Sequence, residues 1–274
     1  MSVFVCPVCG KKLQNEEKRC FCENNHSFDR ASAGYVNLLL PRHGGNHGDD
    51  KLMVRARRDF LDRGYYEPLR EAVCRTLEEK LPDGALVFDA GCGEGYYTAK
   101  MAQTMAEKNG VVFGADISKE ALRIAHKRES SMELAVASLY HLPLADESVD
   151  ALTLIFSPLC PEEFLRVLKP GGLFVMAIPL REHLYGLKAA VYDNPYENEV
   201  KDTAIEGFEL LGMEEIRRTL RLESTDDILN LFSMTPYYYK TSAADQEKLK
   251  NLQSLETEIA FGLLVYRKSG TNRQ

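Results

Sequence analysis

The sequence predicts an α/β fold in which a small N-terminal metal-binding module precedes a doubly wound, Rossmann-like sheet. Two observations predict the sheet: the apolar run 85–88 leads into a glycine-rich turn and a helical pattern, and the apolar run 111–113 ends close to Asp116. Such alternation of strand and helix is typical of parallel sheets. A third observation predicts the module, because four cysteines and a histidine lie within the first 26 residues.

Length and composition are compatible with this organisation. A chain of 274 residues with 45% hydrophobic residues can build one good core and an accessory module. No stretch approaches the roughly 20 apolar residues of a membrane span, and the first residues lack the basic and apolar regions of a signal peptide. Seven cysteines, an odd number, favour reduced thiols or metal ligands. We therefore expect a cytoplasmic protein without a membrane span.

The net charge is distributed unevenly. The chain carries a formal charge of −7, yet residues 1–58 hold ten Lys or Arg against six Asp or Glu. This section therefore has a net charge of +4, and residues 59–274 carry −11. A basic section on an acidic protein is typical of nucleic-acid binding, although ordinary surface charge is the alternative.

The N-terminal module has the ligand spacing of a zinc ribbon. Cys6 and Cys9 form a C-x2-C turn, and Cys22 and His26 form a second pair. Four soft or borderline donors within 21 residues, in a segment with little core of its own, indicate a closed structural zinc site. Cys20 is an alternative third ligand, although the Cys22-x3-His26 loop turns more readily. We expect three regions: a zinc ribbon at 1–40, a linker with helices at 41–80, and the sheet domain at 81–274.

The ribbon also carries features of RNA recognition. Basic side chains separate the two ligand pairs, and aromatic rings that stack or pack lie nearby: Lys11, Lys12, Lys18, Arg19, Phe21 and Phe28. A glycine-rich loop follows, in which His43 and His47 are interpreted as linker residues. Helical periodicity then predicts two helices within 51–80, separated by Gly64 and Pro68.

The glycine-rich turn has the spacing D-x-G-x-G-x-G, with Glu94 inside it. Two carboxylates beside the turn disfavour the pyrophosphate of a dinucleotide such as NAD, and they suit the amino group and sulfonium of S-adenosylmethionine. Asp116 follows the next strand, where a carboxylate accepts both ribose hydroxyls of an adenosine. The predicted cofactor-binding residues are Asp89, Gly91, Gly93, Glu94, Gly95 and Asp116, together with Ser138 in the following segment.

Segments 85–180 resemble the class I methyltransferases in order and spacing. Further matching segments are the ribbon, the stretch 56–66, Arg181-Glu-His183 and Met234-Thr-Pro236. With these segments included, nearly the whole chain resembles the bacterial 23S rRNA guanine-N1 methyltransferases of the RlmA type, which include tylosin-resistance enzymes. The resemblance implies methylation of N1 of a guanine in a 23S rRNA hairpin near the peptide exit tunnel, and a zinc-containing homodimer. It also implies cofactor contacts at Tyr66, Gly93, Glu94 and His183. The glutamate in Arg181-Glu-His183 lengthens the turn expected there.

Several of these residues have structural alternatives. Tyr66 is also interpretable as a core residue, and His183 as a capping residue. His183, Glu162 and Glu163 are candidates for the general base that removes the guanine N1 proton, although the two glutamates also suit the first turn of a helix. Cys92 and Cys160 are interpreted as buried or loop thiols. The target base must leave its duplex, which favours an aromatic residue such as Phe156 near the site.

The remaining chain, 186–274, is expected to extend the core. We predict a strand over 213–220, a helix over 225–232 capped by Thr225, and an aromatic run at 236–240 that either stacks on RNA or packs on the sheet. Two other functions stay open: a small-molecule methyltransferase of the quinone-biosynthesis kind, and a non-catalytic RNA-binding protein. The zinc ribbon speaks against the first, and the intact cofactor turn speaks against the second.

Overall fold

The computed structural model describes residues 2–40, 50–200 and 202–270, so His43 and His47 lie outside the described residues. A three-stranded sheet, β1-β2-β3, forms the ribbon, and an eight-stranded sheet has the order β10-β11-β9-β8-β5-β6-β7-β4. The ribbon strands are β1 (Gln14–Asn15), β2 (Arg19–Phe21) and β3 (Ser27–Asp29). The large sheet contains β4 (Tyr35–Asn37), β5 (Leu86–Ala90), β6 (Val111–Asp116), β7 (Glu133–Val136), β8 (Val149–Ile155), β9 (Leu168–Pro179), β10 (Phe208–Leu222) and β11 (Leu255–Lys268).

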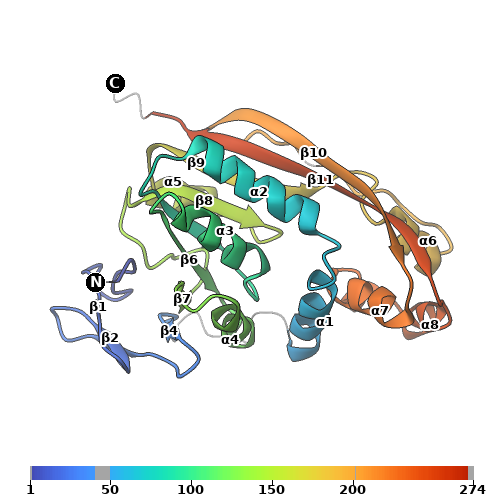
Figure 1. The fold of residues 1–274 in the computed structure, drawn as a ribbon, viewed down its shortest axis with the longest axis horizontal. Helices are drawn as coiled ribbons and strands as arrows, with labels where there is room; N and C mark the ends of the chain where they lie inside the picture. Colours follow the sequence, from blue (N-terminus) through green and yellow to red (C-terminus); the bar gives the residue numbers. More distant parts are fainter. Residues whose placement is uncertain (1, 41–49, 201, 271–274) are drawn as a thin grey trace.

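Six strands of the large sheet, from β4 to β9 in space, run parallel, and β11 and β10 add an antiparallel edge. The helices are α1 (Lys51–Leu61), α2 (Glu67–Lys80), α3 (Tyr96–Ala106), α4 (Lys119–Arg128), α5 (Pro161–Val167), α6 (Tyr185–Val191), α7 (Thr225–Ser233) and α8 (Ala243–Lys250). Helices α2 and α3 lie side by side against the sheet (Figure 1). The sheet order reverses direction between β5 and β8, and in such folds ligands bind at the carboxyl ends of the strands beside this switch. The predicted doubly wound α/β fold is confirmed.

The ribbon shares its core with the large sheet. Phe4 is fully buried, and its ring meets that of Phe113 on β6 edge to face, with 5.7 Å between the centroids. The carboxylate of Glu133 accepts hydrogen bonds from the backbone of Val3 and from the side chains of Ser2 and Asn15. The module at the N-terminus is therefore packed against the sheet as one unit with it (Figure 1).

A short strand after the ribbon was not expected from the sequence, which showed only an apolar run at 33–40. In the structure β4 pairs in parallel with β7 and forms one edge of the large sheet. Three residues are too few for a period-two pattern to be read in the sequence. This pairing joins the chain that leaves the ribbon directly to the strand that precedes Ser138.

The C-terminal predictions need one correction. The helix near 225–232 is present as α7, but its N-cap is Ser224, whose hydroxyl accepts from the backbone N–H of Asp227 at 3.1 Å. The hydroxyl of Thr225 instead donates to the carbonyl of Leu252 at 2.7 Å. The prediction was wrong by one position: Ser224 and Thr225 are adjacent, both residue types cap helices, and Ser is the more favourable of the two. Among the described helices, none combines the length and apolarity needed to cross a bilayer.

Candidate active site and metal centre

The structure brings Cys6, Cys9, Cys22 and His26 together. Their donor atoms all lie within 4.8 Å of one another, with 3.7 Å between Sγ of Cys9 and Sγ of Cys22 and 3.5 Å between Sγ of Cys22 and Nδ1 of His26. Tetrahedral zinc with Zn–S distances of about 2.3 Å holds its ligands at separations of this size. The backbone N–H of Lys11 is the main cause of a lowered pKa at Cys9, which favours the thiolate that a metal binds. The donor set therefore fits a structural zinc ion with no open position.

Cys20 lies apart from these four donors. It is fully buried on β2, and its Sγ lies 3.0 Å from Oδ1 of Asn15 and 3.4 Å from a guanidinium nitrogen of Arg30. Burial raises the pKa of this thiol, which disfavours the thiolate form. The geometry thus favours Cys22 over Cys20 as the third ligand.

The cofactor turn lies between β5 and α3. Gly91, Gly93 and Gly95 have φ values of +79°, +53° and +82°, the left-handed region that favours glycine. The carboxylate of Asp116 accepts from the backbone N–H of Gly93 at 2.9 Å and from that of Ser118 at 2.8 Å. The structure therefore places Asp116 beside the turn, as the βαβ interpretation expects.

The three glycines face different surroundings. A Cβ on Gly95 would collide with Ala125 of α4, and a Cβ on Gly91 would collide with Ser157. A Cβ on Gly93 would meet nothing within 4 Å. Gly93 thus leaves its backbone open to a ligand, and this open face next to Asp116 fits an adenosine-containing cofactor. These features fit S-adenosylmethionine, the cofactor predicted from the sequence.

Asp89 is the last residue but one of β5 and is buried. Its carboxylate accepts hydrogen bonds from the hydroxyls of Thr98 at 2.5 Å and Thr153 at 2.7 Å. Burial raises its pKa to about 6, against the lowering effect of the two hydroxyls. The hydrogen-bond partners of Asp89 are thus protein groups, and these bonds fix the start of α3 to β8. A direct contact of Asp89 with the cofactor stays a prediction.

Glu94 is also buried, and its carboxylate is bound by Arg128 of α4, with 2.7 Å between Oε2 and Nε. The same guanidinium pairs with Asp62, at 2.7 Å, after the end of α1. The side chain of Glu94 therefore ties the turn to two helices, and its predicted cofactor contact stays a prediction. Arg128 was not singled out from the sequence, because nothing local distinguishes it from other basic residues at helix ends.

An aromatic cluster lies near the carboxyl ends of β8 and β9. The ring of Phe261 on β11 is fully buried and contacts His183, Tyr66 and Phe156, with centroids at 4.6, 4.9 and 5.4 Å. The imidazole Nδ1 of His183 accepts from the backbone N–H of Ala260 at 3.3 Å. Burial, and then the charge of Lys188, lower the pKa of His183 to about 3. His183 is thus neutral, with its proton on Nε2.

Glu162 and Glu163 lie in the first turn of α5, as the alternative interpretation expects. Glu162 is exposed, whereas the carboxylate of Glu163 pairs with the guanidinium of Arg166 at 2.6 Å and accepts from the backbone N–H of Leu142 at 2.5 Å. Arg166 also donates to the carbonyls of Leu142 and Leu144. Glu163 therefore holds the loop after β7.

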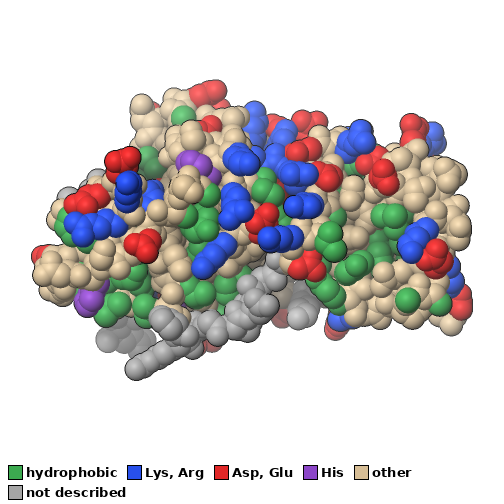
Figure 2. Space-filling model, turned by 90° about the horizontal axis from the view of Figure 1, so that it is seen from below, with side chains coloured by type: hydrophobic (Ala, Val, Ile, Leu, Met, Phe, Trp, Pro, Cys, Tyr) green, Lys and Arg blue, Asp and Glu red, His purple; other side chains and the backbone are tan. Residues whose placement is uncertain are grey.

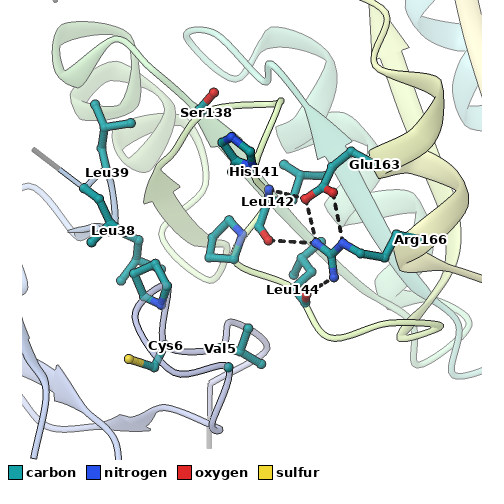
Figure 3. Close-up of a pocket in the computed structure, with 14 residues that line it drawn as sticks. Val5, Cys6, Leu38, Leu39, Ser138, His141, Leu142, Leu144, Glu163 and Arg166 are labelled. Atoms are coloured by element: carbon teal, nitrogen blue, oxygen red, sulfur yellow. Dashed lines mark hydrogen bonds and ion pairs between the residues drawn. The ribbon is translucent and has the colours of Figure 1, made fainter. Parts of the chain in front are cut away.

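Ser138 lies at the head of this loop, on a cavity of about 410 Å³ between the ribbon and the large sheet. Figure 3 shows Val5 and Cys6 of the ribbon on one side of this cavity and Glu163 with Arg166 on the other. The backbone N–H of Val5 donates to the carbonyl of Pro143 at 2.8 Å. The ribbon is thus in direct contact with the loop that carries Ser138.

Cys92 and Cys160 are buried, and burial raises the pKa of both thiols. This agrees with their interpretation as structural thiols. Two residues of the site were not identified from the sequence: Phe261, which holds the aromatic cluster together, and Thr153, which holds Asp89. Each lies in an apolar strand, where a contact with the site depends on sheet register.

Both parts of the chain, the ribbon and the sheet domain, are similar to known proteins. A family model described as the N-terminal zinc ribbon of RlmA matches residues 4–43, and a methyltransferase domain model matches residues 81–252. The 23S rRNA (guanine(748)-N(1))-methyltransferase of Streptomyces fradiae is 35% identical over 226 residues, covering 80% of this chain and 79% of that protein. A Micromonospora griseorubida protein with a 23S rRNA (guanine-N(1)-)-methyltransferase name is 33% identical, covering 87% and 88%. A Bacillus subtilis protein named for the same reaction is 28% identical, covering 97% and 98%.

Proposed function

This chain belongs to the family of methyltransferases that carry an RlmA-type N-terminal zinc ribbon, and on that premise we propose that it methylates N1 of a guanine in 23S rRNA. The observation that carries the proposal is the union of two parts in one packed unit: a ribbon with four zinc donors and an intact cofactor turn. A small-molecule methyltransferase needs only the second part, and a non-catalytic binding protein needs only the first.

The chain's residues supply positioning for this reaction. S-adenosylmethionine supplies an activated methyl group on a sulfonium, so the reaction requires mainly in-line orientation and exclusion of water. Gly93 and Asp116 would hold the adenosine end. The buried cluster of Tyr66, His183 and Phe261 would form an apolar wall on the side where the methyl group is transferred.

The N1 proton of guanine must pass to an acceptor, and a hydrogen-bond donor would stabilise the enolate form of the base that is left. His183 is neutral with its proton on Nε2, so it is equipped to donate a hydrogen bond and not to take a proton. Glu163 is bound by Arg166. Of the three candidates for the general base, the exposed Glu162 is the one whose side chain is most accessible, and we propose it for that role.

A basic surface on α1 and α4 would receive the RNA. Figure 2 shows Lys and Arg side chains gathered on the face seen from below, where α1 and α4 lie in Figure 1. We call this the basic face and define it by exposed residues of the two helices and the turn after α1: Lys51, Arg55, Arg63, Lys119, Arg123 and Lys127. Of these, Lys51, Arg55, Lys119 and Lys127 make no ion pair with any other described residue. Unpaired cations on an acidic protein favour a polyanionic partner.

The finer expectations rest on the resemblance. We propose that the substrate guanine lies in a hairpin near the peptide exit tunnel, that two copies form a homodimer around the RNA, and that methylation affects sensitivity to tylosin. An rRNA substrate also supports the proposal that the protein works in the cytoplasm.

The experiment is methyl transfer from tritium-labelled S-adenosylmethionine to large-subunit rRNA from cells that lack this gene, followed by nucleoside analysis. We expect label in 1-methylguanosine. Asp116→Ala, which removes the acceptor for the ribose and for the backbone N–H of Gly93, should abolish transfer. Tight cofactor binding without label in rRNA would overturn the proposal and direct the search to small-molecule acceptors.

A further inference from the structure

Phe156, the residue that follows β8, has an unusual backbone. Its φ is +58°, in the left-handed region where a bulky residue other than glycine is a genuine outlier. The strain is supported by neighbours, because the hydroxyl of the next residue, Ser157, donates to the carbonyl of Gly91 in the cofactor turn at 3.3 Å. Backbone strain of this kind concentrates at functional sites, where the surrounding structure maintains it.

The exposure of Phe156 is equally unusual, because this large hydrophobic residue is 47% exposed. One side rests on the buried Phe261, with 5.4 Å between the centroids. Phe261 in turn contacts Tyr66 and His183, so the exposed ring is supported by a rigid aromatic layer. Core packing does not explain this position: Phe88 and Phe174, which serve the core, are fully buried.

We propose that Phe156 is the platform on which the extruded guanine stacks for methyl transfer. The proposal rests on the proposed function, since it assigns a residue to the RNA base. The hydrogen bond from Ser157 to Gly91 holds this segment beside the cofactor turn, and the exposed Phe156 lies at the carboxyl end of β8, beside the switch point. An aromatic platform binds a purine through its face, and a planar ring fixes the plane in which N1 meets the methyl group.

Glycine fits the backbone at this position without strain, so the chain carries a ring where a smaller residue would be easier to accommodate. Phe156→Gly therefore removes the ring and relieves the backbone at once. This separates a binding role from a structural one, because a structural role predicts a less stable variant and a strained binding role does not.

The test compares Phe156→Gly, Phe156→Trp and Leu159→Ala with the wild type. Leu159 is a matched control, because it is 40% exposed and lies in the same loop. The readouts are the thermal midpoint, the Kd for S-adenosylmethionine, and kcat and KM on the rRNA hairpin. Base–aromatic stacking corresponds to a change of about 10- to 100-fold.

We expect Phe156→Gly to keep the thermal midpoint and cofactor Kd of the wild type while losing 10- to 100-fold in kcat/KM on RNA. Phe156→Trp should retain activity within a few-fold, and Leu159→Ala should match the wild type. If Phe156→Gly is as active as the wild type, or loses activity only together with stability and cofactor binding, the platform is overturned while the proposed function stands. If the wild type itself transfers no methyl to rRNA, the proposed function fails and the platform falls with it.

Discussion

The carboxylate of Glu94 lies 2.7 Å from Nε of Arg128, and this pair connects the cofactor turn to the last residue of α4. Glu94 is 2% exposed in its side chain, and the guanidinium continues to Asp62 beyond α1. Three segments that are distant in the sequence thus meet at one guanidinium. Gly95, the residue after Glu94, also lies directly against Ala125 of α4, where a Cβ would collide.

Arg128→Met should destabilise the protein by about 3 kcal/mol, since removal of one partner leaves a buried carboxylate without compensation. Burial already raises the pKa of Glu94, so the loss of Arg128 should drive the carboxyl further towards its neutral form. Chemical denaturation at pH 7.5 measures the effect. The control is Arg123→Met on the same helix, whose exposed pair with Glu120 should cost less than about 0.5 kcal/mol. Equal losses in the two variants would contradict the assignment.

Asp89 should make stability depend on pH. Its pKa is about 6 in the folded protein, against 3.8 for an ordinary aspartate, so the unfolded chain releases this proton first as the pH rises. The folded state is therefore disfavoured progressively between about pH 4 and 6, by roughly 3 kcal/mol in total. Asp89→Asn keeps one acceptor and adds a donor for the hydroxyls of Thr98 and Thr153. The free energy of unfolding of this variant, relative to the wild type without cofactor, should rise from pH 4 to pH 7. A difference that does not vary with pH would contradict the shifted pKa.

The sheet and the cofactor turn were predictable because their signals are local. The glycine spacing, the apolar run before Asp89 and the acidic residue after the next strand all lie within about 30 residues, and each follows from backbone geometry. The four zinc donors were recognisable for the same reason. For the choice between Cys20 and Cys22 as the third zinc ligand, the sequence offered only the spacing of the loop from Cys22 to His26.

Long-range contacts were not predictable. Whether Glu94 faces a ligand or Arg128 depends on how α4 returns to the turn, across 34 residues. The aromatic cluster requires the register of β11 against β9, in which Phe261 pairs with Pro179. The strain at Phe156 also has no sequence signal. Its neighbours Ser157 and Pro158 indicate a loop, but they do not indicate whether φ at Phe156 is positive or negative.

Loss of zinc should affect more than the ribbon. The ribbon's Phe4 packs on Phe113 of the large sheet, so unfolding the ribbon exposes part of the common core. We expect Cys22→Ser to reduce bound zinc from one ion per chain to none and to lower the thermal midpoint. Cys20→Ser should retain the ion, because the thiol of Cys20 lies against Asn15 and Arg30. Zinc release measured with a colorimetric chelator, beside thermal unfolding, checks both. Zinc loss in Cys20→Ser but not in Cys22→Ser would exchange the two assignments.

Charge reversal on the basic face should weaken RNA binding through electrostatics. Arg55 on α1 and Lys127 on α4 are exposed, and the two helices are in contact. Each cation that neutralises a phosphate contributes about 0.7 to 0.9 to the slope of log K against log salt concentration. Arg55→Glu with Lys127→Glu should therefore reduce that slope by about 1.4 to 1.8 and lower affinity for the hairpin at least about tenfold at 0.1 M salt.

The matched control reverses two exposed charges at the C-terminal ends of α2 and β11, Lys80→Glu with Arg267→Glu. It changes the net charge by the same amount, so it accounts for the general repulsion between the protein and RNA. Fluorescence anisotropy over a salt series measures both variants. Because the steps of the reaction lie elsewhere, kcat at saturating RNA should stay near the wild-type value in both. If the two double variants lose affinity equally, the attraction reflects net charge alone and the basic face has no special part in binding.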